Sequence, residues 1–251
     1  MGKSKQNRFF NMKISADGKS ADIFIYGEIT KYAWEEYGEV SSITFKNELD
    51  KLGGDVDTIN LYINSPGGSV FETMAIIAML QRHSAEIISH IDGIAASAAS
   101  VLPMISNKVI MYANSLLMIH NAWTYASGNA EQLRKAADDI ERINQSMIQF
   151  YLDRAGDKLD ADTLKQLLDA ETWLTAEEAV QYGLCDEIIE SNNAAARIDE
   201  KWVKQYKNVP KQLVSAQKTA ISAQEMAERK KIAQEAKANS AYLNTILGGM
   251  I

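Results

Sequence analysis

The sequence predicts a mostly parallel α/β fold, and two observations support this prediction. Short apolar stretches typical of strands alternate with stretches whose apolar residues recur at helical spacing, which is the pattern of strand–helix–strand units. Glycine-containing loops also follow two of these strands, at Pro66-Gly67-Gly68 and at Gly93. A chain of 251 residues is long enough to bury one full core and still carry an appendage.

The expected elements start after a polar N-terminal arm at residues 1–20. The first is a strand at 21–26, which Gly27 would end. The next are a helix at 38–52, a strand at 59–63, a helix at 69–82, a strand at 86–91, a helix at 97–106, and strands near 108–112 and 116–119. Open α/β sheets bind ligands at the carboxyl ends of their strands. We therefore expect the functional residues in the loops that follow these strands.

Longer helical patterns follow in the second half of the chain. Apolar residues recur at three- and four-residue steps over 129–156, which predicts one long helix. The segment Thr175-Ala176-Glu177-Glu178 is a capping box, and Gly183 is placed to end the short helix that it starts.

Residues 191–251 differ in composition and form a C-terminal tail. An Asn-Ala linker lies at 192–196, Pro210 interrupts the tail, and 211–240 predicts a polar helix or partial disorder. Residues 192–251 hold 10 Lys and Arg against 5 Asp and Glu, a formal charge of +5, whereas the rest of the chain carries −12, which leaves −7 in total. The acidic body argues against a nucleic-acid-binding core. For the basic tail, a solvated helical face is favoured over contact with nucleic acid.

Cysteine content and hydropathy both favour the cytoplasm. The single cysteine, Cys185, allows no internal disulfide and fits a reducing compartment. It follows Leu184 in an apolar pair, so we expect it to be buried. No run of about 18 apolar residues occurs that could span a membrane, and the first residues lack the apolar core of a signal peptide.

Ser97, His120 and Glu171 each lie in a context that suits one step of acyl transfer. Ser97 lies in the run of very small residues from Gly93 to Ser100, which would let a substrate backbone approach. His120 ends an apolar stretch that reads as a strand. A serine nucleophile needs a base, the base needs an acid to orient it, and the oxyanion needs fixed backbone N–H donors.

Four ordered motifs resemble those of the ClpP family of self-compartmentalising serine peptidases. They are Tyr62-Ile63-Asn64-Ser65-Pro66-Gly67-Gly68, then Gly93-Ile94-Ala95-Ala96-Ser97, then Met118-Ile119-His120-Asn121, and finally Thr172-Trp173-Leu174-Thr175. The resemblance covers residues 21–190, which we take as the peptidase domain. It implies an α/β fold of ClpP/crotonase-like repeated β-β-α units, with the helix at 129–156 protruding as a handle that joins two rings. An ordinary amphipathic core helix is the alternative for that segment.

The resemblance also implies roles for individual residues. Ser97 would be the nucleophile and His120 the general base, with the N–H groups of Gly68 and Ala98 as the oxyanion hole. The third position is Asp in housekeeping members and Glu171 here. Asp169, two residues earlier, is therefore a rival for the orienting acid.

The partners implied by the resemblance are a polypeptide substrate and further copies of the chain, in a heptameric ring or a stacked pair of rings. The chain has no Gly-x-x-x-x-Gly-Lys-Ser/Thr loop, so any ATP dependence would come from a separate ATPase unfoldase. The Ala-rich run around Ser97, the Glu171-Thr172-Trp173 segment and the basic tail resemble phage and prophage members, which are associated with capsid proteins. We expect no cofactor and no metal, because His83 and His90 lack ligand spacing.

Two other functions remain open. The related crotonase fold uses a similar oxyanion hole on acyl-CoA thioesters, but it needs no serine–histidine pair at these positions. A ring-forming scaffold without activity is the second alternative, and the Glu171 departure is what favours it. Cleavage specificity, natural substrate and ring size do not follow from the sequence.

Overall fold

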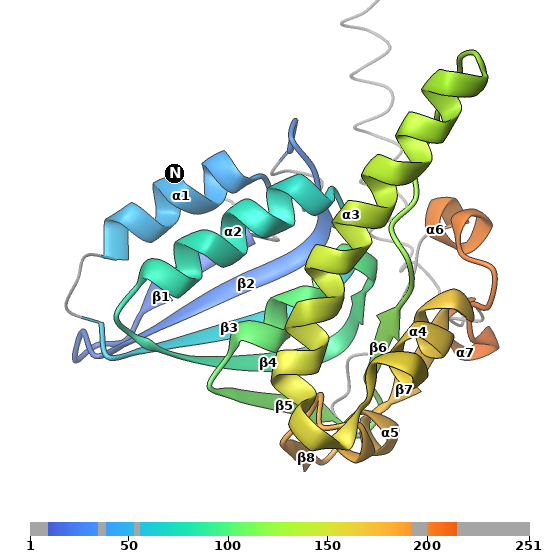
Figure 1. Cartoon of the computed structure of the whole chain (residues 1–251). Coiled ribbons are helices and arrows are strands. Elements are labelled where there is room, and N and C mark those ends of the chain that lie inside the picture. The colour runs from blue at the N-terminus through green and yellow to red at the C-terminus, as the bar shows by residue number, and fades with distance from the viewer. Residues whose placement is uncertain (1–9, 35–38, 53–55, 192–199, 215–251) are drawn as a thin grey trace, which may run out of the picture. The chain divides into compact units, whose positions relative to one another are not determined.

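The computed structural model describes residues 10–34, 39–52, 56–191 and 200–214 (Figure 1). These residues belong to one compact unit that ends at Val214. The mixed α/β architecture predicted from the sequence is confirmed.

An 8-stranded sheet forms the centre of this unit. Its strands are β1 (Phe10–Ile14), β2 (Ser20–Ile29), β3 (Thr58–Gly68), β4 (Glu86–Ala96), β5 (Lys108–Tyr112), β6 (Leu116–Ile119), β7 (Thr172–Thr175) and β8 (Glu187–Ile189). The order is β1-β2-β3-β4-β5-β8, and β6 lies beside the second half of β4 and pairs with β7. The ladders from β2 to β5, β4 to β6 and β5 to β8 are parallel, whereas β1–β2 and β6–β7 are antiparallel.

Helices follow the strands in the alternation that the sequence predicts. They are α1 (Ser42–Leu52), α2 (Val70–Arg82), a 3₁₀ helix η2 (Ser97–Ile105), α3 (Ala130–Ala155), a 3₁₀ turn η3 (Gly156–Lys158), α4 (Ala161–Asp169), α5 (Ala176–Gln181), α6 (Glu200–Gln205) and α7 (Lys211–Val214). The predicted capping box opens α5, since Thr175 and Glu178 cap each other's backbone N–H groups. Gly183 follows the helix with a φ of 73°, a conformation that glycine adopts without strain.

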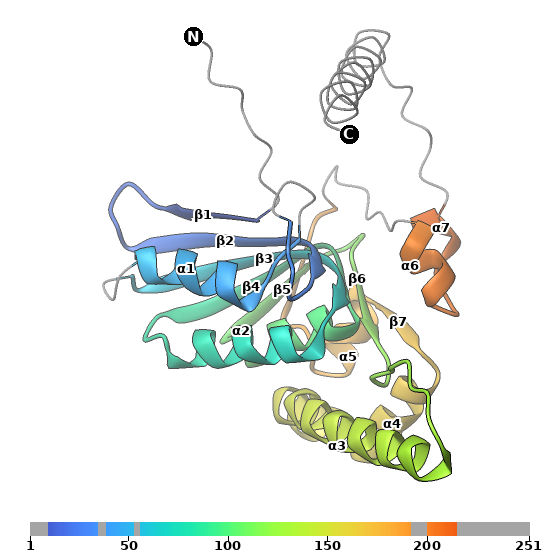
Figure 2. The ribbon, with the colours of Figure 1, turned by 90° about the horizontal axis from the view of Figure 1, so that it is seen from above.

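The main core lies between the sheet and α1, α2 and the second half of α3, and Figure 2 shows these helices on the same side of the sheet. Alternate residues of β2 and β3 are fully buried, as expected for strands with one face against helices. Cys185 is buried in this core, as the sequence predicts. Its burial raises the pKa of the thiol.

Four strands differ in extent from the prediction, and one of them is β4, which was expected at 86–91 and continues to Ala96. Residues 10–14 of the expected polar arm form β1 against β2. Gly27 does not end β2, because the strand passes through a register shift there and continues to Ile29. In the same way β3 runs on through the Pro66-Gly67-Gly68 turn, with Gly68 paired to Ile29. Gly27 therefore marks a bulge rather than a strand end.

Helix α3 protrudes from the body, as predicted (Figure 1). An Asn129–Gln132 capping box starts it. Its first half is mostly solvent-exposed, including Leu133, whereas Met147 and Tyr151 in the second half are buried. At 1.5 Å per residue, 26 residues make a rod about 39 Å long.

Residues 200–214, from the predicted C-terminal tail, pack on the peptidase body. Trp202, Tyr206 and Leu213 are buried with Ile94 and Met118 in a second, smaller apolar cluster. Pro210 separates α6 from α7. The predicted linker at 192–196 and the part of the predicted polar helix beyond 214 lie outside the described residues.

Candidate active site

Ser97 lies at the sharp turn between β4 and η2. Its φ is 54°, in the left-handed region that residues with a Cβ rarely adopt. The buried Ser100 hydroxyl donates to the Ser97 carbonyl oxygen at 2.5 Å, and the Tyr151 hydroxyl lies 2.6 Å from Ser100 Oγ. A strained strand-to-helix turn of this kind presents a serine hydroxyl outward for attack.

His120 lies beside Ser97 because their strands are neighbours. β6 pairs with β4 in parallel, with Met118 opposite Ala96, so the next residues along both strands leave the sheet at the same edge. Nε2 of His120 is 2.7 Å from Oγ of Ser97. This distance is a hydrogen bond, and it is the geometry that a general base needs to take the serine proton.

The surroundings of His120 favour a neutral imidazole. Burial lowers its pKa most, the Glu171 carboxylate opposes this shift, and the Lys207 ammonium adds to it. A neutral imidazole at neutral pH has a free nitrogen lone pair for the Ser97 proton.

The Gly67-Gly68 turn closes against the nucleophile turn. A Cβ on Gly67 would lie 2.5 Å from the Ala96 carbonyl oxygen and 3.1 Å from the amide nitrogen of Ala98, and one on Gly68 would lie 2.1 Å from the Ile29 carbonyl oxygen. Their φ values, 96° and 139°, also favour glycine.

The Ser65 hydroxyl ties this turn to the β2 bulge. It donates to the Gly27 carbonyl at 2.5 Å and accepts from the Gly67 N–H at 3.1 Å. Gly67, the neighbour of the predicted oxyanion donor Gly68, is the residue that approaches the amide of the other predicted donor, Ala98. Ala98 lies in the first turn of η2, where N–H groups have no intrahelical acceptor.

The two candidate acids have different partners. Glu171 is buried, and its Oε1 accepts from the backbone N–H groups of Lys207, at 2.6 Å, and Asn208, at 2.9 Å. Asp169 is exposed and accepts from Asn121 at 2.7 Å and from Lys165 at 2.6 Å. The structure therefore brings Ser97 and His120 together, but within the described residues neither carboxylate is hydrogen-bonded to the imidazole.

Glu171 and Asp169 also differ in the groups with which their charges interact. The Glu171 carboxylate acts on the pKa of His120. Asp169 has its own pKa lowered by the neighbouring Lys165 and Asn121. Glu171 is thus the better placed of the two to orient the imidazole after a local rearrangement.

Sequence reasoning missed Tyr206 and Trp202. The Tyr206 ring meets the His120 ring edge-on, with centroids 5.6 Å apart, and stacks on Trp202. Its hydroxyl donates to the Pro66 carbonyl at 2.5 Å. Burial raises the pKa of Tyr206, and the Ser97 hydroxyl beside it opposes that rise. Two aromatic residues four apart in a basic tail were the available signal, because that spacing places them on one helix face.

A cleft of about 1080 Å³ opens beside these residues. Ser97, His120, Gly68 and Glu171 line it from the body, and the side chains of α6 line it from the tail. It is large enough for several residues of a polypeptide.

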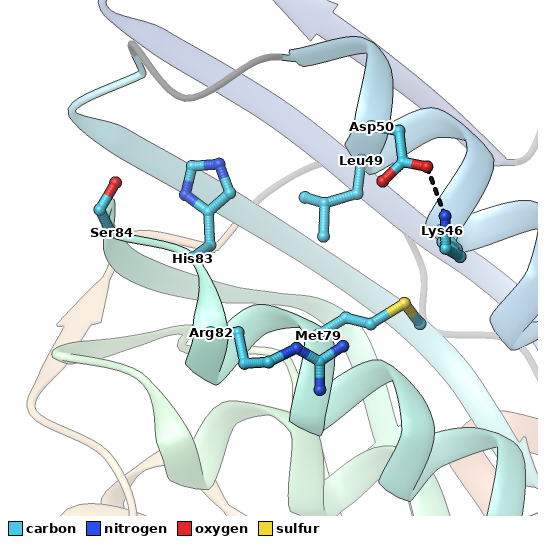
Figure 3. Close-up of a pocket in the computed structure, with 7 residues that line it drawn as sticks. All are labelled: Lys46, Leu49, Asp50, Met79, Arg82, His83 and Ser84. Atoms are coloured by element: carbon cyan, nitrogen blue, oxygen red, sulfur yellow. Dashed lines mark hydrogen bonds and ion pairs between the residues drawn. The ribbon is translucent and has the colours of Figure 1, made fainter.

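A second groove lies between α1 and α2, away from the carboxyl edge of the sheet (Figure 3). Its side chains include an exposed Lys46–Asp50 ion pair and His83, whose Nδ1 accepts from the Ala85 N–H. Neither Ser97 nor His120 lines this groove. Within the described ranges, no cluster of three or more His, Cys, Asp or Glu residues could hold a metal ion, and no helix is long and apolar enough to cross a membrane.

The fold and the site define a class: an α/β protein with a serine–histidine pair at the carboxyl edge of its sheet. The family comparison makes this specific, since a model described as Clp protease matches residues 11–192. The chain belongs to this family, as its four motifs predict. Among its relatives is the ATP-dependent Clp protease proteolytic subunit from two strains of Bacteroides fragilis. Each is 35% identical over 146 residues, which cover 56% of this chain and 68% or 64% of the relative.

Proposed function

We propose that the protein is a serine endopeptidase that hydrolyses accessible or unfolded polypeptides. The observation that carries this proposal is the 2.7 Å contact between Ser97 Oγ and His120 Nε2 at a strained strand-to-helix turn. Membership of the Clp protease family supports a peptidase. An acyl-CoA enzyme of the crotonase type is disfavoured, because it has no use for this pair.

In the proposed mechanism, Ser97 Oγ attacks the scissile carbonyl carbon while His120 Nε2 takes its proton. The N–H groups of Gly68 and Ala98 donate to the carbonyl oxygen as it becomes negative. His120 then returns the proton to the leaving amine, and water repeats the sequence on the acyl-enzyme. Glu171 orients the imidazole and stabilises its cation.

We also propose that the chain works as a homo-oligomeric ring, heptameric or doubled, in the cytoplasm. The protruding α3 supports this proposal, because about the first half of the helix is solvent-exposed and does not pack on the core of the body. The relatives' name includes ATP dependence, and this chain carries no phosphate-binding loop. A separate ATPase unfoldase would therefore supply it. Capsid maturation in a phage or prophage is the more specific proposal, and it rests on sequence resemblance.

Peptide hydrolysis tests the function. Wild type and Ser97→Ala are compared on casein, on a co-expressed capsid protein and on short fluorogenic peptides, with products mapped by mass spectrometry and oligomer size measured by sedimentation. We expect cleavage by wild type alone. Equal cleavage by Ser97→Ala would refute the assignment, and a folded wild type that cleaves nothing would favour the scaffold function.

A further inference from the structure

Residues 200–214 contact the groups that the proposed chemistry needs. Tyr206 places its ring against His120 and its hydroxyl beside Ser97. The same hydroxyl donates to the Pro66 carbonyl, next to the turn that holds the proposed oxyanion donor Gly68. A substrate carbonyl positioned for attack needs the space around these atoms. The cleft lined by Ser97 and His120 stays open in this state, so Tyr206 limits the room for a substrate beside Ser97 rather than filling the cleft.

The backbone after Tyr206 also engages Glu171. The N–H groups of Lys207 and Asn208 both donate to Glu171 Oε1, and the Asn208 side chain donates to the Ala170 carbonyl at 2.8 Å. Both backbone bonds end on Oε1, so the segment fixes where the Glu171 carboxylate lies. From that position the carboxylate acts on the pKa of His120, but among the described residues the imidazole donates no hydrogen bond to it.

Apolar contacts hold the segment in place. Trp202, Tyr206 and Leu213 are each less than 7% exposed, and they cover Ile94 and Met118 near the ends of β4 and β6. If the segment left, Ile94 and Met118 would form an exposed apolar surface beside Ser97. Such a surface can bind the apolar side chains of an unfolded polypeptide.

Several features of residues 200–214 favour their detachment from the body. Its helices span 6 and 4 residues, lengths at which a helix is not stable alone in water. Its ion pair, Lys201 to Glu28, is largely exposed on the lysine side and so contributes little. The helices of the segment are therefore stable only while they pack on the apolar cluster of the body. A polypeptide that binds the same apolar surface can displace the segment.

We propose that residues 200–214 are an autoinhibitory segment that covers part of the polypeptide-binding surface beside Ser97 and fixes Glu171 where it makes no hydrogen bond to His120. This inference rests on the proposed peptidase function and concerns its regulation. Release of the segment exposes the apolar surface and breaks the bonds from Lys207 and Asn208 to Glu171, so that the carboxylate can accept a hydrogen bond from the imidazole.

Release also changes the electrostatics of His120. In the closed state burial and Lys207 lower the pKa of His120, and Glu171 opposes them from a position fixed by the segment. Departure of the segment removes Lys207, exposes the imidazole and lets Glu171 approach. All three changes raise the pKa of His120, so the acid limb of the reaction moves to higher pH.

The test uses the full chain and a fluorophosphonate probe that labels an active serine. Trp202→Ala/Tyr206→Ala removes the two stacked aromatic side chains, and Lys211→Ala is the control in the same segment, since Lys211 is exposed. We expect the double variant to label Ser97 about 10- to 100-fold faster than wild type, because an open state is typically about 1–10% populated before such a change. The control should label at the wild-type rate. A synthetic peptide of residues 200–214 added to the double variant should slow labelling again.

Tyr206→Phe keeps the ring and removes only the hydroxyl, which guards against misfolding of the double variant. It should give a smaller acceleration with a thermal unfolding midpoint only slightly below that of wild type, because the Pro66 carbonyl loses one donor. The acid limb of labelling in the double variant should move to higher pH. Equal or slower labelling of Ser97 in both variants would overturn the inference and make the segment a permanent wall of the cleft, with the peptidase function intact. If no folded variant, wild type included, labels at Ser97, the proposed function itself fails.

Discussion

The hydroxyl chain from Tyr151 through Ser100 to the Ser97 carbonyl supports the strained nucleophile turn, and its removal has a calculable cost. A serine hydroxyl has one proton. Ser100 donates that proton to the Ser97 carbonyl, so Tyr151 must be the donor to Ser100 Oγ. Ser100 and Tyr151 are both buried, so bulk solvent does not reach a partner that has been left unpaired.

Ser100→Ala should therefore be the most damaging single change in this chain of bonds. It leaves the Tyr151 hydroxyl buried without an acceptor, at a cost of about 1–3 kcal/mol in the free energy of unfolding. It also frees the carbonyl of Ser97, whose left-handed conformation costs about 1–3 kcal/mol and persists only with support. A displacement of Ser97 by about 1 Å would slow acylation roughly 10²-fold.

Tyr151→Phe should cost less, about 1 kcal/mol, because Ser100 still donates to Ser97. The double variant Ser100→Ala/Tyr151→Phe removes both partners of the buried bond, so it should be more stable than Ser100→Ala alone while remaining slow. Urea unfolding gives the stabilities, and fluorophosphonate labelling of Ser97 gives the rates. Additive losses of stability in the double variant would refute this account of the turn, as would full labelling speed in Ser100→Ala.

Three further predictions concern the site itself. Ser97→Ala and His120→Ala should each lower peptide hydrolysis by roughly 10⁴–10⁶, and the double variant should be no worse, since the pair acts as one unit; additive losses in a peptidase assay would separate their roles. Glu171→Gln should cut the rate roughly 10²–10⁴-fold with Asp169→Asn near wild type, because of these two carboxylates Glu171 is the one that acts on the pKa of His120. The reverse order of kcat/KM values would transfer the role to Asp169. The base must be neutral, and burial lowers the pKa of His120, so wild-type kcat/KM should persist down to about pH 6.5 and fall only below it; a loss that starts above pH 7 in a pH–rate profile would contradict the neutral base.

The sequence predicts the order and type of most elements because local patterns determine them. Helix α3 was expected over 129–156 and spans Ala130–Ala155, since its apolar spacing and its N-cap are both local. Strand ends were predicted less well. Gly27 and the Pro66-Gly67-Gly68 turn are typical breakers, yet β2 and β3 continue through them because each provides the other's ladder. A pairing between residues about 40 apart leaves no local signal.

The site divides in the same way. Ser97, His120 and the Gly67-Gly68 turn lie in short motifs, so the sequence alone could single them out as candidates, and the structure adds the distances between them. The hydrogen-bond partners of Glu171 could not be predicted from the sequence, because they come from the distant C-terminal tail. Tyr206 and Pro66 are 140 residues apart in sequence, and only the folded chain brings that phenol to the nucleophile.

Covalent labelling of the intact protein tests the central claim most directly. Wild type is treated with a fluorophosphonate probe at pH 7.5, digested and mapped by mass spectrometry, with Ser97→Ala and His120→Ala as controls. The account predicts one adduct, on Ser97, absent from Ser97→Ala and greatly reduced in His120→Ala. An adduct on another serine, or equal labelling in His120→Ala, would contradict it.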